Sequence, residues 1–153
     1  MENKIVSFLR ESNKTISFAE SCTGGALSKR IVLIPGASEF FNGSIVSYSN
    51  NSKINILNIK TEDIKKYSVV SEKVANEMAI NAMKIFNSDY CISATGNAGP
   101  NNYDEISQSG QVYVTVITPE KVITQEFKLS NNRSKNIENT VDFALSLLYK
   151  NLR

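Results

Sequence analysis

Three small side chains of the nucleophile type follow one another near the start of the chain. The segment "AESCTGG" places Ser21, Cys22 and Thr23 directly before a pair of glycines. If a strand turns into a helix here, backbone N–H groups and the positive end of the helix dipole lie close to the serine. Such surroundings stabilise an anion, either a phosphate or a developing oxyanion. The alternative is that Ser21 or Thr23 only caps the helix, as Ser and Thr commonly do.

A nucleophilic serine needs a base, and the chain contains no histidine. A lysine can serve if burial lowers its pKa from the usual value of about 10.4. Lys53, in "YSNNSK", falls on the first turn of a predicted helix and is the main candidate. The alternatives are that Lys53 is a solvated surface lysine and that Glu20, the nearest carboxylate, acts through a water molecule.

Two other segments carry groups that could contact a substrate. "ATGNAGP" follows a predicted buried strand, so a sharp turn there could aim the Thr95 hydroxyl and the backbone at Gly96 into a cleft at the carboxyl end of the sheet. Arg133, just before the last predicted helix, could bind a phosphate through two hydrogen bonds. A plain turn and a solvated arginine are the corresponding alternatives.

The two cysteines of the chain are Cys22 and Cys91. Cys22 is an alternative nucleophile, but strand alternation points it away from Ser21, and no histidine is present to form a thiolate pair. Cys91 lies within the apolar segment "YCISA" and is expected in the core. Two cysteines are too few for a disulfide framework, which favours a reducing, cytoplasmic location.

The elements that must position these residues alternate between helices and strands. The first helix carries Ile5, Val6, Phe8 and Leu9 on one side and ends before Asn13. A second helix is predicted over 23–34, short helices over 50–59 and 61–67, a long one from Ser71 and a last one over 131–152. Strands are predicted over 15–19, 41–49 with a bulge at Gly43, and 90–94, followed by a hairpin that turns at Pro119-Glu120.

This order predicts an α/β fold, a three-layer α/β/α sandwich. The hairpin makes two neighbouring strands antiparallel, so the sheet must be mixed. We find no repeat and no linker, so we expect one domain over residues 1–153.

Bulk composition excludes several classes of function. The net charge of +2, from 17 basic and 15 acidic residues, gives no reason to expect a nucleic-acid partner. The amphipathic start is unlike a signal peptide, and no apolar run reaches the length of a membrane span. With no histidine and two cysteines, a zinc site is not expected, and the carboxylates lack EF-hand spacing.

The segment from Asn97 to Ser109 is rich in Gly, Asn and Ser and carries no predicted element. Long loops within a compact domain are usually functional or mobile. We therefore predict a mobile rim that selects the substrate.

Taken together, these segments resemble the C-terminal domain of the competence/damage-inducible protein CinA. The resemblance covers nearly the whole chain and rests on "AESCTGG", "PGAS" with "NG", "YSNNSK", "VSEKVANEMA", "TGNAGP" and Gly110, in this order. The stand-alone members act as nicotinamide-nucleotide amidase. The resemblance thus implies hydrolysis of nicotinamide mononucleotide to nicotinate mononucleotide and ammonia in pyridine nucleotide salvage, with no metal or cofactor, in a chain that can form homo-oligomers.

The resemblance also implies roles for individual residues. Ser21 becomes the nucleophile and Lys53 the general base of a serine–lysine dyad, and Thr95 assists at the oxyanion or at the dyad. The implied substrate-binding residues are Thr23, Gly24, Gly25, Tyr48, Asn50, Gly96 and Arg133.

The chain departs from the family pattern after "TGNAGP", where "NNYDEISQS" replaces further glycines and a Lys-Pro pair, and Asn97 replaces an aliphatic residue. This departure motivates an alternative: a catalytically inactive nucleotide-binding or interaction module of the same family. Release of ammonia from nicotinamide mononucleotide discriminates between the two.

Overall fold

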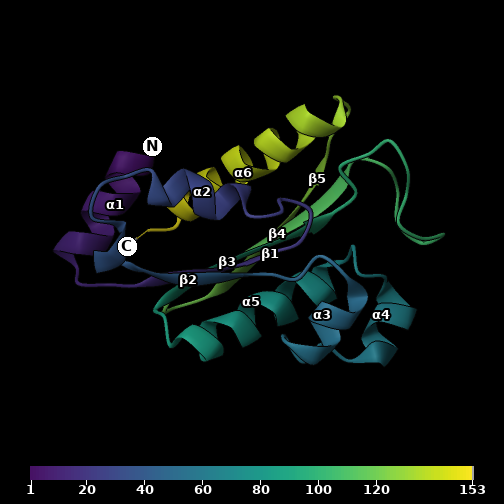
Figure 1. Cartoon of the computed structure of the whole chain (residues 1–153), viewed down its shortest axis with the longest axis horizontal. Coiled ribbons are helices and arrows are strands. Elements are labelled where there is room, and N and C mark those ends of the chain that lie inside the picture. Colours follow the sequence, from purple (N-terminus) through teal and green to yellow (C-terminus); the bar gives the residue numbers. More distant parts are fainter. Residues whose placement is uncertain (153) are drawn as a thin grey trace.

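A five-stranded mixed sheet forms the centre of the molecule, with helices on both faces (Figure 1). The computed structural model describes residues 1–152. The strand order is β2-β1-β3-β4-β5, and the strands are β1 (Ile16–Glu20), β2 (Phe41–Val46), β3 (Tyr90–Gly96), β4 (Gln111–Ile117) and β5 (Val122–Lys128). β1 pairs in parallel with both β2 and β3, whereas β4 is antiparallel to β3 and to β5. The predicted α/β/α sandwich with a mixed sheet is confirmed.

The helices form two outer layers. They are α1 (Glu2–Glu11), α2 (Ala26–Val32), α3 (Asn50–Asn55), α4 (Thr61–Tyr67), α5 (Glu72–Phe86) and α6 (Arg133–Lys150), with a single 3₁₀ turn at Ala37–Glu39. Figure 1 shows α1, α2 and α6 over one face of the sheet and α3, α4 and α5 over the other. None of the helices within residues 1–152 is long and apolar enough to cross a membrane.

Alternation along β1 divides the core into two clusters. Phe18 packs into the larger cluster with residues of α1, α2 and α6, and Ala19 packs into the smaller cluster with residues of α5. Because helices cover both faces of the sheet, all five residues of β1 are buried. Glu20 therefore follows Phe18 on the face that α2 covers, two positions along the strand.

Parallel pairing brings the candidate residues to one edge of the sheet. Glu20, the last residue of β1, lies opposite Ala94, two residues before the end of β3, and the Ser21 N–H donates to the Ala94 carbonyl at 2.9 Å. Ser21 and Thr95 therefore meet at the carboxyl edge, where ligands bind in open α/β sheets. The α3 helix, which carries Lys53, follows β2 at the same edge.

The element after Ser21 differs from the prediction. The helix begins at Ala26 and not at Thr23, because Gly24 and Gly25 take the positive φ angles of 56° and 98° that glycine alone adopts at little cost. Gly25 is the N-cap, with no side-chain cap, so the interpretation of Ser21 or Thr23 as a helix cap is wrong. These two glycines allow the chain to turn sharply between β1 and α2.

Other predicted features agree better with the observed helices and strands. The predicted bulge is confirmed, since Ile16 pairs with Phe41 but Ser17 pairs with Gly43. The helix from Ser71 is also confirmed, with the Ser71 hydroxyl accepting from the Val74 N–H at 3.2 Å. β3 continues to Gly96, so Thr95 and Gly96 belong to a strand and not to the following loop.

Candidate active site

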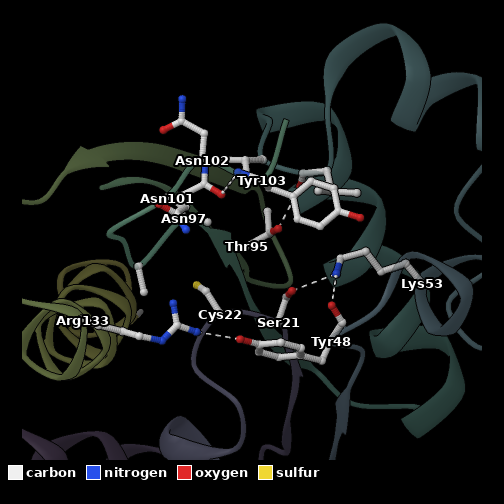
Figure 2. Close-up of a pocket in the computed structure, with 14 residues that line it drawn as sticks. Ser21, Cys22, Tyr48, Lys53, Thr95, Asn97, Asn101, Asn102, Tyr103 and Arg133 are labelled. Atoms are coloured by element: carbon white, nitrogen blue, oxygen red, sulfur yellow. Dashed lines mark hydrogen bonds between the residues drawn. The ribbon is translucent and has the colours of Figure 1, made fainter. Parts of the chain in front are cut away.

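A cavity of about 200 Å³ opens at the carboxyl ends of β1 and β3 (Figure 2). It is lined by Ser21, Cys22, Tyr48, Lys53, Val69, Val70, Thr95, Gly96, Asn97, Ala98, Asn101, Asn102, Tyr103 and Arg133. These residues come from the turn after β1, from α3 and the segment before it, from the segment before α5, from β3 and the loop that follows it, and from the start of α6.

Ser21 and Lys53 contact each other at the floor of this cavity. Lys53 Nζ lies 2.8 Å from Ser21 Oγ, and Figure 2 shows the two groups pointing toward one another. Lys53 is 1% exposed and Ser21 is 7% exposed. The lysine is therefore buried against the serine, and the interpretation of Lys53 as a solvated surface residue is wrong.

Two backbone carbonyls complete the surroundings of the Lys53 amine. Nζ donates to the carbonyl of Ser47 at 2.7 Å and to that of Tyr48 at 3.4 Å. No carboxylate within residues 1–152 forms an ion pair with it. Burial lowers the pKa of Lys53 to about 8, because the charged form loses its hydration without gaining a counter-ion.

This arrangement suits a neutral amine. A neutral lysine has two N–H bonds and one lone pair. When the N–H bonds point at the Ser47 and Tyr48 carbonyls, the lone pair is left for the Ser21 hydroxyl. In that form the serine donates its hydrogen to the lysine, which is the geometry that proton abstraction requires.

Cys22 lines the same cavity, but its thiol is not in the thiolate form that a nucleophile requires. It is 7% exposed, and burial raises the pKa of its thiol to about 12. A thiol with this pKa is protonated at neutral pH, and the thiolate is the reactive form. Cys91 is fully buried in β3, as predicted for a core residue, and burial raises its pKa to about 12 as well.

Thr95 joins two segments that line the cavity, the end of β3 and the segment before α5. Its hydroxyl donates to the Val69 carbonyl at 2.8 Å and is buried. Gly96 follows it at a point where a Cβ would lie only 2.5 Å from the Val112 side chain and 2.8 Å from the Gln111 carbonyl. A larger residue at Gly96 would push β3 away from β4 and distort this part of the cavity.

Arg133 connects two sides of the cavity mouth. Its guanidinium donates to the Tyr48 hydroxyl at 2.7 Å and to the Gly99 carbonyl at 2.8 Å. Figure 2 shows the Arg133 side chain reaching from α6 toward the Tyr48 ring. An arginine offers five N–H donors, so these two bonds leave others for an anion.

The structure gathers most of the residues singled out from the sequence, but not all of them. Ser21, Tyr48, Lys53, Thr95, Gly96 and Arg133 line the cavity, whereas Thr23, Gly24, Gly25 and Asn50 do not. The Thr23 hydroxyl donates to Glu20 at 2.8 Å, and the Asn50 Oδ1 atom is buried with no partner in the described part of the chain.

The sequence-based expectation of an anion-binding helix terminus beside Ser21 is wrong. The Glu20 carboxylate accepts hydrogen bonds from the N–H groups of Gly25, Leu27 and Ser28. The start of α2 is thus occupied by an anion that belongs to the protein. Sequence reasoning did not foresee this contact, although a carboxylate directly before a strand-to-helix turn is a signal that could have suggested it.

The loop after β3 contributes Asn101, Asn102 and Tyr103 to the rim, as its predicted position implies. Asn97 ties it together, since its side chain donates to Ser107 at 2.8 Å and accepts from the Tyr103 N–H at 3.0 Å. Asp104 accepts from the Ser107 N–H at 2.8 Å. The mobility of the rim stays a prediction.

We expect the rim to act on substrate binding more than on chemistry. Replacing residues 101–106 ("NNYDEI") with a short glycine linker removes the Tyr103 ring and two amides from the cavity but leaves Ser21 and Lys53 in place. Steady-state kinetics should show KM rising more than kcat falls. An unchanged KM would show that this segment does not contact the substrate.

The class of this protein is an α/β/α domain that carries a buried serine–lysine pair at the carboxyl edge of its sheet. Residues 1–152 match the family model of the CinA C-terminal domain. The chain belongs to this family.

Relatives and solved structures agree with this assignment. A CinA-like protein of Flavobacterium psychrophilum is 41% identical over 99% of this chain and 36% of its own length. A putative competence-damage inducible protein of Thermoanaerobacter pseudethanolicus is also 41% identical, over 99% of this chain and 37% of its own. The chain spans about a third of the length of these curated relatives.

The crystal structure of a competence or damage-inducible protein from Enterobacter asburiae has a TM-score of 0.96 and 29% identity over 99% of this chain and 96% of that one. A competence/damage inducible protein from Agrobacterium tumefaciens has a TM-score of 0.92 and 26% identity over 97% of this chain and 92% of that one.

Proposed function

We propose that this chain hydrolyses the carboxamide of nicotinamide mononucleotide to nicotinate mononucleotide and ammonia. The observation that carries the proposal is the 2.8 Å contact between Ser21 Oγ and the buried amine of Lys53. A lysine whose pKa is about 8 is partly neutral at physiological pH and can accept the serine proton. The amide class of substrate and its nucleotide come from the family resemblance.

The first half of the reaction forms an ester on Ser21. The hydroxyl proton passes to Lys53 Nζ as Ser21 Oγ bonds to the carboxamide carbon, whose electrophilicity is increased by the pyridinium ring. Lys53, now an ammonium, donates a proton to the amide nitrogen as the C–N bond breaks, and ammonia leaves. Lys53 is neutral again after this step.

The second half returns the enzyme to its starting state. Neutral Lys53 takes a proton from water as the water oxygen bonds to the ester carbon. The C–O bond to Ser21 then breaks, and Lys53 returns the proton to Ser21 Oγ. The products are free enzyme and the carboxylic acid, which releases its proton to solvent and becomes the carboxylate.

The N–H group of Cys22, which lines the cavity directly after Ser21, is the candidate for stabilising the oxyanion. In the turn after Ser21, the N–H groups of Cys22 and Thr23 donate to no acceptor within residues 1–152, whereas those of Ser21, Gly24, Gly25, Ala26, Leu27, Ser28 and Lys29 all do. Free donors next to a nucleophile are the usual components of an oxyanion hole. Each such donor contributes about 10²–10³-fold to kcat in enzymes of this kind.

Thr95 suits a different task. Its hydroxyl hydrogen is already donated to the Val69 carbonyl, so it cannot also donate to an oxyanion while that bond persists. Its oxygen can still accept a hydrogen bond. We propose that Thr95 accepts from the NH₂ group of the carboxamide and thereby orients the carbonyl carbon toward Ser21.

The mouth of the cavity suits a phosphate attached to a flat ring. Arg133 supplies positive charge with spare donors, and the Tyr48 and Tyr103 rings line the cavity nearby. The Arg133→Ala variant should raise KM for nicotinamide mononucleotide about 10- to 100-fold, because a hydrogen bond to a charged group contributes about 1.5–3 kcal/mol. Lys135→Ala, two residues along α6 and outside the cavity, is the matched control and should leave KM unchanged.

The same variants also test the choice of ligand. Nicotinamide riboside lacks the phosphate, so its kcat/KM should be nearly equal in wild type and in Arg133→Ala. An equal loss of kcat/KM for both substrates would show that Arg133 holds Tyr48 and Gly99 in position and does not bind the phosphate. Ammonia release from nicotinamide mononucleotide by the wild-type chain is the first assay, and its absence would favour the inactive binding module.

A further inference from the structure

Glu20 is the most deeply buried carboxylate next to the candidate site, and the mechanism above does not use it. It is 0% exposed, ends β1 and directly precedes Ser21. It does not line the cavity. An ionisable group fully removed from water is costly unless its oxygens are well hydrogen-bonded, so this position requires a physical reason.

One oxygen of this carboxylate holds the turn that follows Ser21. Oε2 accepts from the Thr23 hydroxyl at 2.8 Å, from the Gly25 N–H at 3.0 Å and from the Leu27 N–H at 3.0 Å. These three donors span the turn from its middle to the first turn of α2. One atom therefore links the end of β1 with the start of α2 across the turn that carries the serine.

The other oxygen secures the same carboxylate to α2 and to the neighbouring strand. Oε1 accepts from the Ser28 N–H at 2.9 Å, from the Ser28 hydroxyl, and from the Ser44 hydroxyl on β2 at 3.3 Å. No cation within residues 1–152 forms an ion pair with Glu20. The negative charge is compensated by neutral donors alone.

Saturation of both oxygens rules out a role as base. A carboxylate has about four lone-pair sites, and six donors converge on this one. No acceptor capacity remains for a water molecule that would activate Ser21. The alternative in which Glu20 acts as a water-mediated base is therefore not supported by the geometry.

We propose that Glu20 is a positioning residue for the nucleophile. Its carboxylate fixes the turn between β1 and α2, and this keeps Ser21 Oγ at 2.8 Å from Lys53 Nζ and leaves the N–H groups of Cys22 and Thr23 free. This inference rests on the proposed function, in which Ser21 attacks the substrate. A displacement of about 1 Å at such a group can cost about 10²-fold in rate.

The Glu20→Gln variant tests most directly whether the turn requires a carboxylate, with two accepting oxygens, at this position. Both oxygens of the carboxylate accept from backbone N–H groups, so an amide NH₂ at either place would face a donor. We expect kcat for nicotinamide mononucleotide to fall about 10-fold in Glu20→Gln and about 10²-fold in Glu20→Ala. KM should change less than about threefold, because Glu20 lies outside the cavity.

Asp89→Asn is the matched control. The Asp89 carboxylate accepts from Lys14 Nζ at 2.8 Å, from the Thr15 N–H at 2.9 Å and from the Thr15 hydroxyl at 3.1 Å, at the opposite end of β1. Its substitution should lower the thermal midpoint without changing kcat. Loss of kcat in proportion to lost stability in both variants would reduce Glu20 to a structural residue and overturn the proposal.

Two further readouts separate this role from the others. The acid limb of the kcat/KM profile should keep its apparent pKa in Glu20→Gln, and loss of that limb would instead make Glu20 the base. Labelling of Ser21 by a fluorophosphonate, followed by peptide mass spectrometry, should be fast in wild type and slow in both Glu20 variants. Equal labelling rates would overturn the positioning role.

Labelling also distinguishes failure of this proposal from failure of the proposed function. A wild-type chain that is labelled at Ser21 but does not hydrolyse nicotinamide mononucleotide would refute the substrate and still test Glu20. A wild-type chain that shows neither turnover nor labelling would refute the nucleophile, and with it this role for Glu20.

Discussion

The Ser21→Ala variant should lose at least about 10⁴-fold in kcat on nicotinamide mononucleotide, because removal of the nucleophile from a coupled nucleophile–base pair abolishes the covalent route altogether. Only the catalysis due to binding and oxyanion stabilisation would remain. The variant should fold normally, since the change removes one oxygen atom that bonds to Lys53. Steady-state ammonia release and a thermal denaturation curve measure the two properties.

Cys22→Ala is the control for that result. Cys22 lines the same cavity, but its pKa of about 12 leaves the thiol protonated, so the variant should retain most of the activity. High activity in Ser21→Ala together with low activity in Cys22→Ala would transfer the nucleophilic role to the cysteine.

Lys53→Arg should be as inactive as Lys53→Ala. Arginine remains charged at any accessible pH, so it cannot accept the serine proton. The larger guanidinium must also fit a position that is 1% exposed and bounded by the Ser47 and Tyr48 carbonyls. Losses of about 10³-fold or more are expected for both variants, since the base and the nucleophile act as a unit. Substantial activity in Lys53→Arg would remove Lys53 from the role of base.

The pH dependence follows from the same amine. Burial lowers the pKa of Lys53 to about 8, and the neutral form is the active one. The kcat/KM should therefore be low on the acid side, rise through an apparent pKa of about 8 and level off above it. A rate that climbs until about pH 10, as an unperturbed lysine requires, would contradict the buried base.

The sequence was sufficient to predict the layers of the fold because its periodic patterns are strong. β1 and β3 are short apolar runs, and the hairpin of β4 and β5 made a mixed sheet necessary. The absence of histidine left a lysine as the main candidate for the base, and the resemblance to the CinA family paired Lys53 with Ser21. Their 2.8 Å contact depends on parallel pairing at one sheet edge, which a linear pattern does not specify.

Two predictions about the segment after Ser21 were wrong: the residue at which the helix begins and the anion that its first N–H groups bind. The turn after Ser21 was predicted as helix because it is followed by a helical pattern, but Gly24 and Gly25 adopt positive φ angles instead. The predicted anion site at the start of α2 is filled by Glu20, whose six contacts come mostly from residues 23–28 in the turn and helix that follow it, with one from Ser44 on β2. Which donors this carboxylate reaches depends on the path of the turn, and hydrophobic periodicity does not specify that path.

The proposed reaction requires an ester between Ser21 and the carboxamide carbon of nicotinamide mononucleotide. Rapid acid quench of wild type with this substrate, digestion and peptide mass spectrometry test for this ester most directly. The Ser21 peptide should carry an adduct with the mass of the substrate less ammonia, and the adduct should be absent from Ser21→Ala. Turnover of the substrate with the Ser21 peptide unmodified at every quench time, or with the adduct on Cys22, would contradict the account.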